Sequence, residues 1–167
     1  MVSKRPCRKT RFNQKTGYPS KLPGWGLSNV VDKDLILAKA ASIRRHLVRA
    51  AEKAAVPAKA FKSDLDRQEI VMFNLQMAIQ NCIDVAAHIV SEEGYGVPGS
   101  ANEMFYLLEE NGLLAHDATE NMVQAVGMRN LMVHEYGKIN LDQIHQAAQK
   151  DIKDLEIFIQ SILKKIS

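Results

Sequence analysis

One segment, residues 63–93, constrains the fold of this chain more than any other. Its apolar residues fall on most sides of a helix instead of forming one stripe, and they are Ile70, Phe73, Leu75, Met77, Ile79, Ile83, Val85, Ala86, Ala87, Ile89 and Val90. A helix that is apolar over most of its girth is buried on several sides. We therefore expect the central helix of a bundle here, beginning at a capping box of Ser63 and Asp66 and ending near Glu93.

The remainder of the chain from Asp32 onward also has helical periodicity, and no alternating β-pattern of useful length interrupts it. The further helices expected are one over about 33–55, a short one from Ser100, one from Asp117 to Gly137, and one from Asn140 to the C-terminus. Short turns separate them. The prediction is an all-α protein, an up-and-down four-helix bundle with an additional short helix.

Length and charge divide the chain into two parts. Its 167 residues suffice for one sizeable core and make two ordinary domains improbable. Residues 1–30 carry seven of the 22 Lys and Arg residues and none of the 19 Asp and Glu residues, so the remainder has 15 basic and 19 acidic side chains. We expect residues 1–30 to be a basic, flexible N-terminal extension and residues 31–167 to be one helical domain. Two alternatives for the extension are an arm that binds nucleic acid and a misassigned start codon, with the natural start at Val30 or Val31.

Cysteine usage and hydropathy indicate the compartment. Cys7 lies in the basic extension and Cys82 lies in an apolar helix, a distribution that suggests neither a disulfide framework nor a zinc site. No apolar run approaches the roughly 20 residues that span a bilayer, and no signal-peptide pattern follows the basic N-terminus. We therefore expect a cytoplasmic protein that does not insert into membranes.

Reactive side chains gather at the end of the helix expected to finish at Gly137. The run is Arg129-Asn130-Leu131-Met132-Val133-His134-Glu135-Tyr136. At about 100° per residue, Tyr136 falls nearly above Arg129, whereas His134 lies about 140° round from it. Arg129 and His134 can therefore serve one site only if the helix distorts near its end or if two copies of the chain contribute. The spacing suggests a homodimer.

The residue types in this run suit one kind of chemistry. His134 can transfer protons near neutral pH, and Arg129 offers fixed charge and paired donors for a phosphate, while no carboxylate cluster is present that would hold magnesium. This set fits metal-independent cleavage of RNA by its own 2′-hydroxyl, with a base to remove the proton and a cation to stabilise charge on the phosphoryl oxygens. DNA lacks that nucleophile. The alternative is that His134 only ends a helix, where it interacts favourably with the helix dipole.

The pattern of Arg, four residues, His, one residue and Tyr occurs in a known family. With it the sequence resembles the HepT-like group of HEPN-domain proteins, small all-α bacterial and archaeal ribonucleases. Residues 73–80 and 84–90 look like the second helix of that family, and residues 127–130 look like its approach to the motif. The resemblance covers about residues 32–167 and does not include the extension.

The resemblance implies a HEPN-type bundle that forms a homodimer, with the motif helices of two subunits meeting at a cleft. It implies an RNA substrate, no cofactor, and a toxin whose partner is a minimal nucleotidyltransferase antitoxin that transfers AMP to Tyr136. By matching positions, it assigns Arg129 to phosphate binding and transition-state charge, His134 to proton transfer as either acid or base, and Asn130 to a supporting role as donor.

Two questions stay open at this point. Asp84 and Gln80 either line the cleft or form a solvated or interhelical polar seam. The second question is whether the chain is a catalyst, because related HEPN bundles serve as non-catalytic subunits that bind nucleotides or partners for nucleotidyltransferases. The complete motif favours the endoribonuclease.

Overall fold

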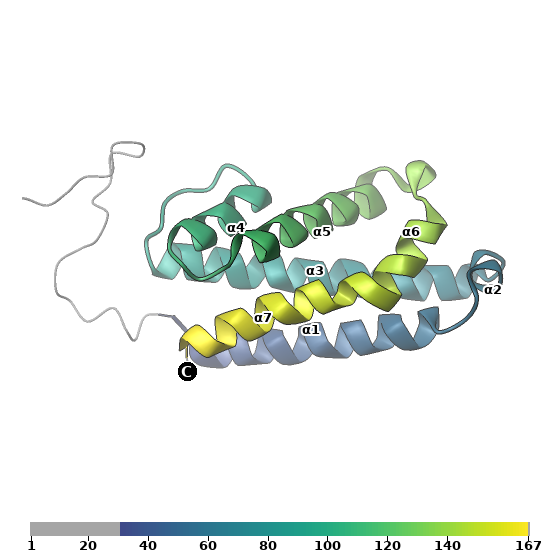
Figure 1. Cartoon of the computed structure of the whole chain (residues 1–167), viewed down its shortest axis with the longest axis horizontal. Coiled ribbons are helices and arrows are strands. Elements are labelled where there is room, and N and C mark those ends of the chain that lie inside the picture. The colour runs from purple at the N-terminus through teal and green to yellow at the C-terminus, as the bar shows by residue number, and fades with distance from the viewer. Residues whose placement is uncertain (1–30, 167) are drawn as a thin grey trace, which may run out of the picture.

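The computed structural model describes residues 31–166, so the extension predicted over residues 1–30 lies outside the described residues. All regular elements in the described part are helical: α1 (Lys33–Ala54), α2 (Ala58–Lys62), α3 (Leu65–Glu92), α4 (Ala101–Glu110), α5 (His116–His134), a 3-10 turn (Tyr136–Lys138), α6 (Leu141–Gln146), a π-helical segment (Ala147–Asp151) and α7 (Ile152–Ile166). The all-α prediction is confirmed (Figure 1).

Four long elements form the bundle. α1 and α3 run antiparallel beside each other, α5 packs on α3 and α7, and α7 also contacts α1, while the short α4 covers α3 and α5 near the N-terminal end of α5 (Figure 1). The largest side chains that these helices bury completely are Phe61, Phe105, Phe158, Ile36, Ile43, Leu47, Ile79, Ile89, Leu108, Met122, Ile162 and Val71. The arrangement is the predicted bundle of long helices with a short accessory helix.

α3 has the central position that its apolar girth predicts. It buries 13 of its 28 residues and contacts α1, α4, α5 and α7. Among the described helices it alone is long and apolar enough to cross a membrane, but 56% of its most apolar window is buried inside the bundle. More than half of that apolar window therefore packs inside the bundle.

The start of α3 differs from the prediction. Asp64, not Ser63, caps the helix, since its Oδ1 accepts a hydrogen bond from the backbone N–H of Arg67 at 2.9 Å. Ser63 instead ends α2, a five-residue helix that the periodicity did not predict, and its hydroxyl donates to the carbonyl of Ala60 at 3.1 Å. The α2 turn places Phe61 completely inside the core, which explains why this segment is helical.

The other predicted helix ends were partly correct. Ser100 caps α4, and Asn140 caps α6, each by accepting backbone N–H bonds with its side-chain oxygen. The helix predicted from Asp117 begins one residue earlier, at His116, and no side chain caps it. The single helix predicted from Asn140 onward is interrupted by the π-helical segment Ala147–Asp151, which separates α6 from α7.

Candidate active site

The helix that carries the motif ends at His134, earlier than the predicted end at Gly137. Glu135 leaves the helical conformation with φ −133° and ψ 47°, and Tyr136 begins the 3-10 turn that leads to α6. The expectation that Tyr136 lies above Arg129 on one helix is therefore wrong, because Tyr136 is not on the helix. Arg129 and His134 both belong to the regular part of α5, so distortion of the helix does not bring them to one face.

Within one protomer the motif side chains make few contacts. The Nη1 atom of Arg129 lies 3.4 Å from Oδ1 of Asn130, so the structure brings these two together. His134 and Asn130 are exposed and Arg129 is half-buried, and His134 makes no hydrogen bond or ion pair with another described side chain. Leu131 and Val133 between them are 40% and 43% exposed. This end of α5 therefore projects beyond the protomer's core with its polar groups available.

The turn after α5 carries a basic side chain. Lys138 forms an ion pair with Glu135 across the turn, and the Lys138 side chain is 76% exposed. The Glu135 side chain is 43% exposed. Tyr136 stands between Glu135 and Lys138 in the sequence. The predicted modification site is therefore in the same turn as the long, basic side chain of Lys138.

Of the two predicted cleft residues on α3, Asp84 bonds to α1 and Gln80 bonds to Asp84. The Nζ atom of Lys39 lies 2.7 Å from Oδ2 of Asp84, and Nε2 of Gln80 donates to Oδ1 of Asp84 at 2.9 Å. Lys39 also donates to the buried Asn81 at 3.0 Å. These bonds run to α1 and along α3 and not to the motif, so within the protomer the residues form an interhelical polar seam. Their role in lining a cleft stays a prediction.

A groove that the sequence did not indicate lies beside the motif, between α5 and the α6–α7 region. It consists of two adjoining hollows of about 330 and 400 Å³, which share Gln124, Met128, Gln146 and Asp151. The hollow nearer the motif is further lined by Gly127, Leu131, Met132, Ile139, Asn140, Gln143 and Ile144.

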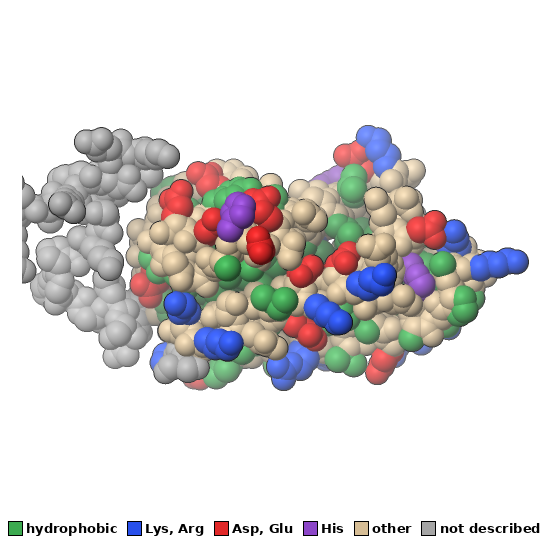
Figure 2. Space-filling model, in the orientation of Figure 1, with side chains coloured by type: hydrophobic (Ala, Val, Ile, Leu, Met, Phe, Trp, Pro, Cys, Tyr) green, Lys and Arg blue, Asp and Glu red, His purple; other side chains and the backbone are tan. Residues whose placement is uncertain are grey.

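Figure 2 shows acidic side chains gathered over α4 and the start of α5, and lysines and arginines along the edge formed by α1 and α7.

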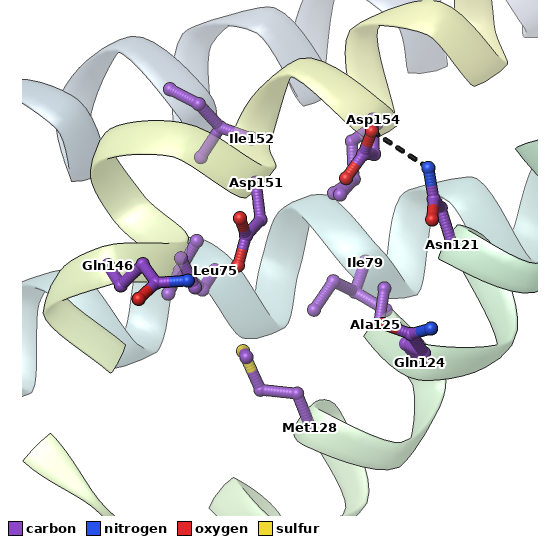
Figure 3. Close-up of a pocket in the computed structure, with 12 residues that line it drawn as sticks. Leu75, Ile79, Asn121, Gln124, Ala125, Met128, Gln146, Asp151, Ile152 and Asp154 are labelled. Atoms are coloured by element: carbon purple, nitrogen blue, oxygen red, sulfur yellow. Dashed lines mark hydrogen bonds between the residues drawn. The ribbon is translucent and has the colours of Figure 1, made fainter. Parts of the chain in front are cut away.

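The hollow farther from the motif is acidic. Asp151 and Asp154 both line it, and Nδ2 of Asn121 donates to Oδ1 of Asp154 at 2.9 Å (Figure 3). Burial raises the pKa of the Asp154 carboxyl, the charge of Asp151 raises it further, and the bond from Asn121 opposes the shift. Sequence reasoning missed the contact between Asn121 and Asp154 because α5 and α7 meet only in the folded chain. Among residues 31–166, no group of three His, Cys, Asp or Glu side chains is arranged to hold a metal ion.

Comparisons with known proteins agree in sequence and in fold. The model of the family described as Ribonuclease HepT-like matches residues 39–162. The mRNA nuclease HepT of Shewanella oneidensis is 36% identical over 129 residues, which cover 77% of this chain and 96% of that protein. The tRNA nuclease HepT of Aphanizomenon flos-aquae is 26% identical over 102 residues, covering 61% of this chain and 69% of that protein.

A solved structure has the same fold over most of the chain. It is that of the tri-AMPylated Shewanella oneidensis HEPN toxin in complex with MNT antitoxin. The TM-score is 0.74 at 34% sequence identity, and the match covers 80% of this chain and 99% of that one. The matched part of this chain therefore has the fold of that toxin.

Proposed function

This chain belongs to the HepT-like ribonuclease family, and from that premise we propose that it is the toxin of a toxin–antitoxin pair, an endoribonuclease that a nucleotidyltransferase antitoxin silences by AMPylation. The observation that carries the proposal is the family match over residues 39–162, which includes all of α5 and the complete motif from Arg129 to Tyr136. The related Shewanella toxin, which is tri-AMPylated and in complex with its MNT antitoxin, supports the regulatory part.

The proposed reaction uses the RNA as its own nucleophile. The 2′-oxygen attacks the adjacent phosphorus and its proton goes to a general base. The bond from phosphorus to the 5′-oxygen breaks, and a general acid gives that oxygen a proton, so the products are a 2′,3′-cyclic phosphate and a 5′-hydroxyl. Arg129 binds the phosphate and stabilises the charge that builds on its oxygens, and His134 transfers one of the protons. The Oδ1 atom of Asn130 accepts from the Arg129 guanidinium, which leaves the Asn130 Nδ2 group as a supporting donor toward the RNA. We expect this reaction to need no metal.

We place the complete site between two copies of the chain. Arg129 and His134 lie about 140° apart on a regular helix, so one protomer does not present both on the same face. Val133, which is 43% exposed, presents apolar surface between them that a second copy would cover. A two-fold axis near this end of α5 would bring side chains of different faces together. In such a dimer, Asp84 and Gln80 are candidates for the cleft wall in addition to their places in the polar seam between α1 and α3.

Regulation falls on Tyr136. In the proposed modification the phenolic oxygen attacks the α-phosphorus of ATP, the bond to the β-phosphate breaks, pyrophosphate leaves, and the phenolic proton goes to a base. Each AMP adds bulk and negative charge beside the place where an RNA phosphate binds, so it opposes access and electrostatic attraction. We place this activity in the cytoplasm and in residues 31–167, with the RNA substrate and the antitoxin as partners.

Expression of the chain alone in bacteria tests the proposal. The wild type is expected to arrest growth and cleave RNA, while Arg129→Ala and His134→Ala abolish both effects. Arg45→Ala and His116→Ala are matched controls, because both side chains are exposed and lie outside the motif, and they are expected to stay toxic. Purified protein should keep its RNA cleavage in the presence of EDTA.

The same experiment separates the two classes of function. If all these proteins were equally harmless and inert towards RNA, the catalytic proposal would be wrong, and the chain would be a subunit that binds a nucleotide or a partner. Mass spectrometry after coexpression with the antitoxin tests the regulation separately. Added AMP on the wild type and none on Tyr136→Phe is the expected result.

A further inference from the structure

We propose that the groove beside the motif is a nucleobase-binding site and that it holds the adenine of an AMP group carried by Tyr136. The inference rests on the proposed function, because it takes Tyr136 as the modified residue. It adds a location for the base of that nucleotide. The groove meant here is the hollow of about 400 Å³ between α5 and α6.

The position of the groove relative to the modified turn is the first argument. Leu131 and Met132 on α5 line it just before the turn Tyr136–Lys138, and Ile139 and Asn140 line it just after that turn. The backbone that carries Tyr136 therefore leaves one wall of the groove and enters the other. The proposal places a group attached to this tyrosine at the mouth of the groove, which the two walls on either side of the turn define.

The size and the walls of the groove suit a flat aromatic ring. Pockets that bind small molecules commonly measure about 300–1,000 Å³, and this one falls within that range. Met128, Leu131, Met132, Ile139 and Ile144 provide apolar walls. Methionine side chains adapt to irregular shapes, and their sulfur makes favourable contacts with aromatic rings. The walls can therefore cover both faces of a base.

The edges of the groove suit the polar edge of adenine. The side chains of Gln124, Gln143 and Gln146 line it and make no hydrogen bond with another described residue, so each carboxamide has both donors and its acceptor available. A carboxamide can pair with N6 and N7 of adenine at once. Asp151 adds a carboxylate that can accept from an exocyclic amino group. This combination favours a base that carries an amino group.

Charge fixes which end of the nucleotide enters. The carboxylate of Asp151 in the groove wall and that of Asp154 in the adjoining hollow repel a phosphate, so the phosphate stays outside and the neutral base goes in. Lys138, in the turn that carries Tyr136, has an exposed side chain whose ammonium pairs with Glu135 in the unmodified chain and can turn to the phosphate of the modified one. The nucleotide thus has its anionic part at the cationic turn and its base in the acidic groove.

The site also explains how a docked AMP would act on catalysis. Gly127, Leu131 and His134 lie at helical spacings of four and seven residues, so they share one face of α5. Gly127 and Leu131 line the groove. A base seated against them lies along the face that presents His134, and an RNA strand could not occupy the same face at the same time.

Methyl NMR on methionine tests the site directly. The ring current of an adenine beside Met128 and Met132 is expected to shift their ε-methyl signals when Tyr136 is AMPylated. Met72 and Met122 are buried elsewhere in the core and serve as internal references that should not shift. The probes are the full chain AMPylated by its antitoxin, and the unmodified chain titrated with 5′-AMP or with ribose 5-phosphate, which has no base.

Gly127 provides a blocking variant and a matched control. An added Cβ at Gly127 meets no atom within 4 Å, and the residue is helical, so substitution there is tolerated by the protomer. Gly127→Leu is expected to fill the groove and remove the methyl shifts, whereas Gly127→Ala keeps them. Both variants are compared at the same oligomeric state, which gel filtration reports.

The outcomes are distinct for the two proposals. Mass spectrometry that finds no AMP on Tyr136 would contradict the proposed regulation, and the titration with free 5′-AMP would still decide the groove. Shifts at Met128 and Met132 with 5′-AMP but not with ribose 5-phosphate support a base site. A modified Tyr136 without shifts at these methyls, or equal shifts in Gly127→Leu, would overturn the inference.

Discussion

Lys39 of α1 and Asp84 of α3 form an ion pair in which Nζ and Oδ2 lie 2.7 Å apart, and the same ammonium donates to Oδ1 of Asn81 at 3.0 Å. The side chains of the pair are 31% and 38% exposed, so water screens the interaction only in part. The pair links the two longest helices of the bundle at a fixed register. A residue predicted for the catalytic cleft thus has a structural role in the protomer.

Removing this link should weaken the fold. Asp84→Ala is expected to lower the free energy of unfolding by roughly 1 kcal/mol, because Lys39 and Gln80 lose their shared acceptor. Urea denaturation of Asp84→Ala, Lys39→Ala and the double variant measures the coupling of the pair. If Asp84→Ala left stability unchanged and abolished RNA cleavage, its role would lie in the cleft and not in the seam.

The motif pair should affect activity and not stability. Arg129→Ala and His134→Ala are each expected to slow RNA cleavage by roughly 100-fold or more, the range in which losing charge stabilisation or proton transfer slows a reaction. Their unfolding midpoints should match the wild type, because His134 is exposed and Arg129 lies at the projecting end of α5. Cleavage of a labelled RNA by purified protein measures the rates. If either variant were unfolded, the prediction for that residue would be wrong, because its loss of activity would come from loss of the fold and not from loss of a catalytic group.

The carboxylate of Asp154 should reduce stability at neutral pH. Burial and the charge of Asp151 raise its pKa in the folded protein, so folding favours the protonated form and stability falls as the pH rises from the unfolded pKa through the folded one. Asp154→Asn removes the charge and keeps an oxygen for Asn121, so it is expected to raise stability by roughly a few tenths of a kcal/mol at pH 7. The gain should disappear near pH 3, where the wild-type carboxyl is protonated. Thermal melts at both pH values check this.

His116, at the start of α5, should make the folded protein more stable at low pH than at high pH. The hydrogen bond from His116 to Glu109, 3.0 Å long, and the charge of that carboxylate raise the pKa of His116. The stabilisation is therefore complete below the unfolded pKa and is lost as the pH rises through the folded one. His116→Gln should lower the unfolding midpoint at pH 5.5 and leave it unchanged at pH 9. An equal loss at both values would show that the charge is not involved.

Local signals predicted most of the helices correctly. Asp32, Ser100 and Asn140 cap the helices that were expected to follow them, since a cap depends on a side chain and the backbone N–H groups two or three residues later. The same signals misplaced the start of α3, where Ser63 and Asp64 are adjacent and both are good caps. The need to bury Phe61 in α2 decided between them, and periodicity over five residues does not indicate such a need.

The sequence by itself determined that the chain is helical, that residues 63–93 lie at its centre, and which residues form the motif. These properties depend on side chains within a few turns of one another, and such spacings are visible along the chain. Only the tertiary structure decided that Tyr136 leaves α5, that Asp84 bonds to α1, and that a groove lies beside the motif. Each of these depends on which helices meet and at what angle. The packing of the whole core sets that choice, and no single segment of the sequence contains it.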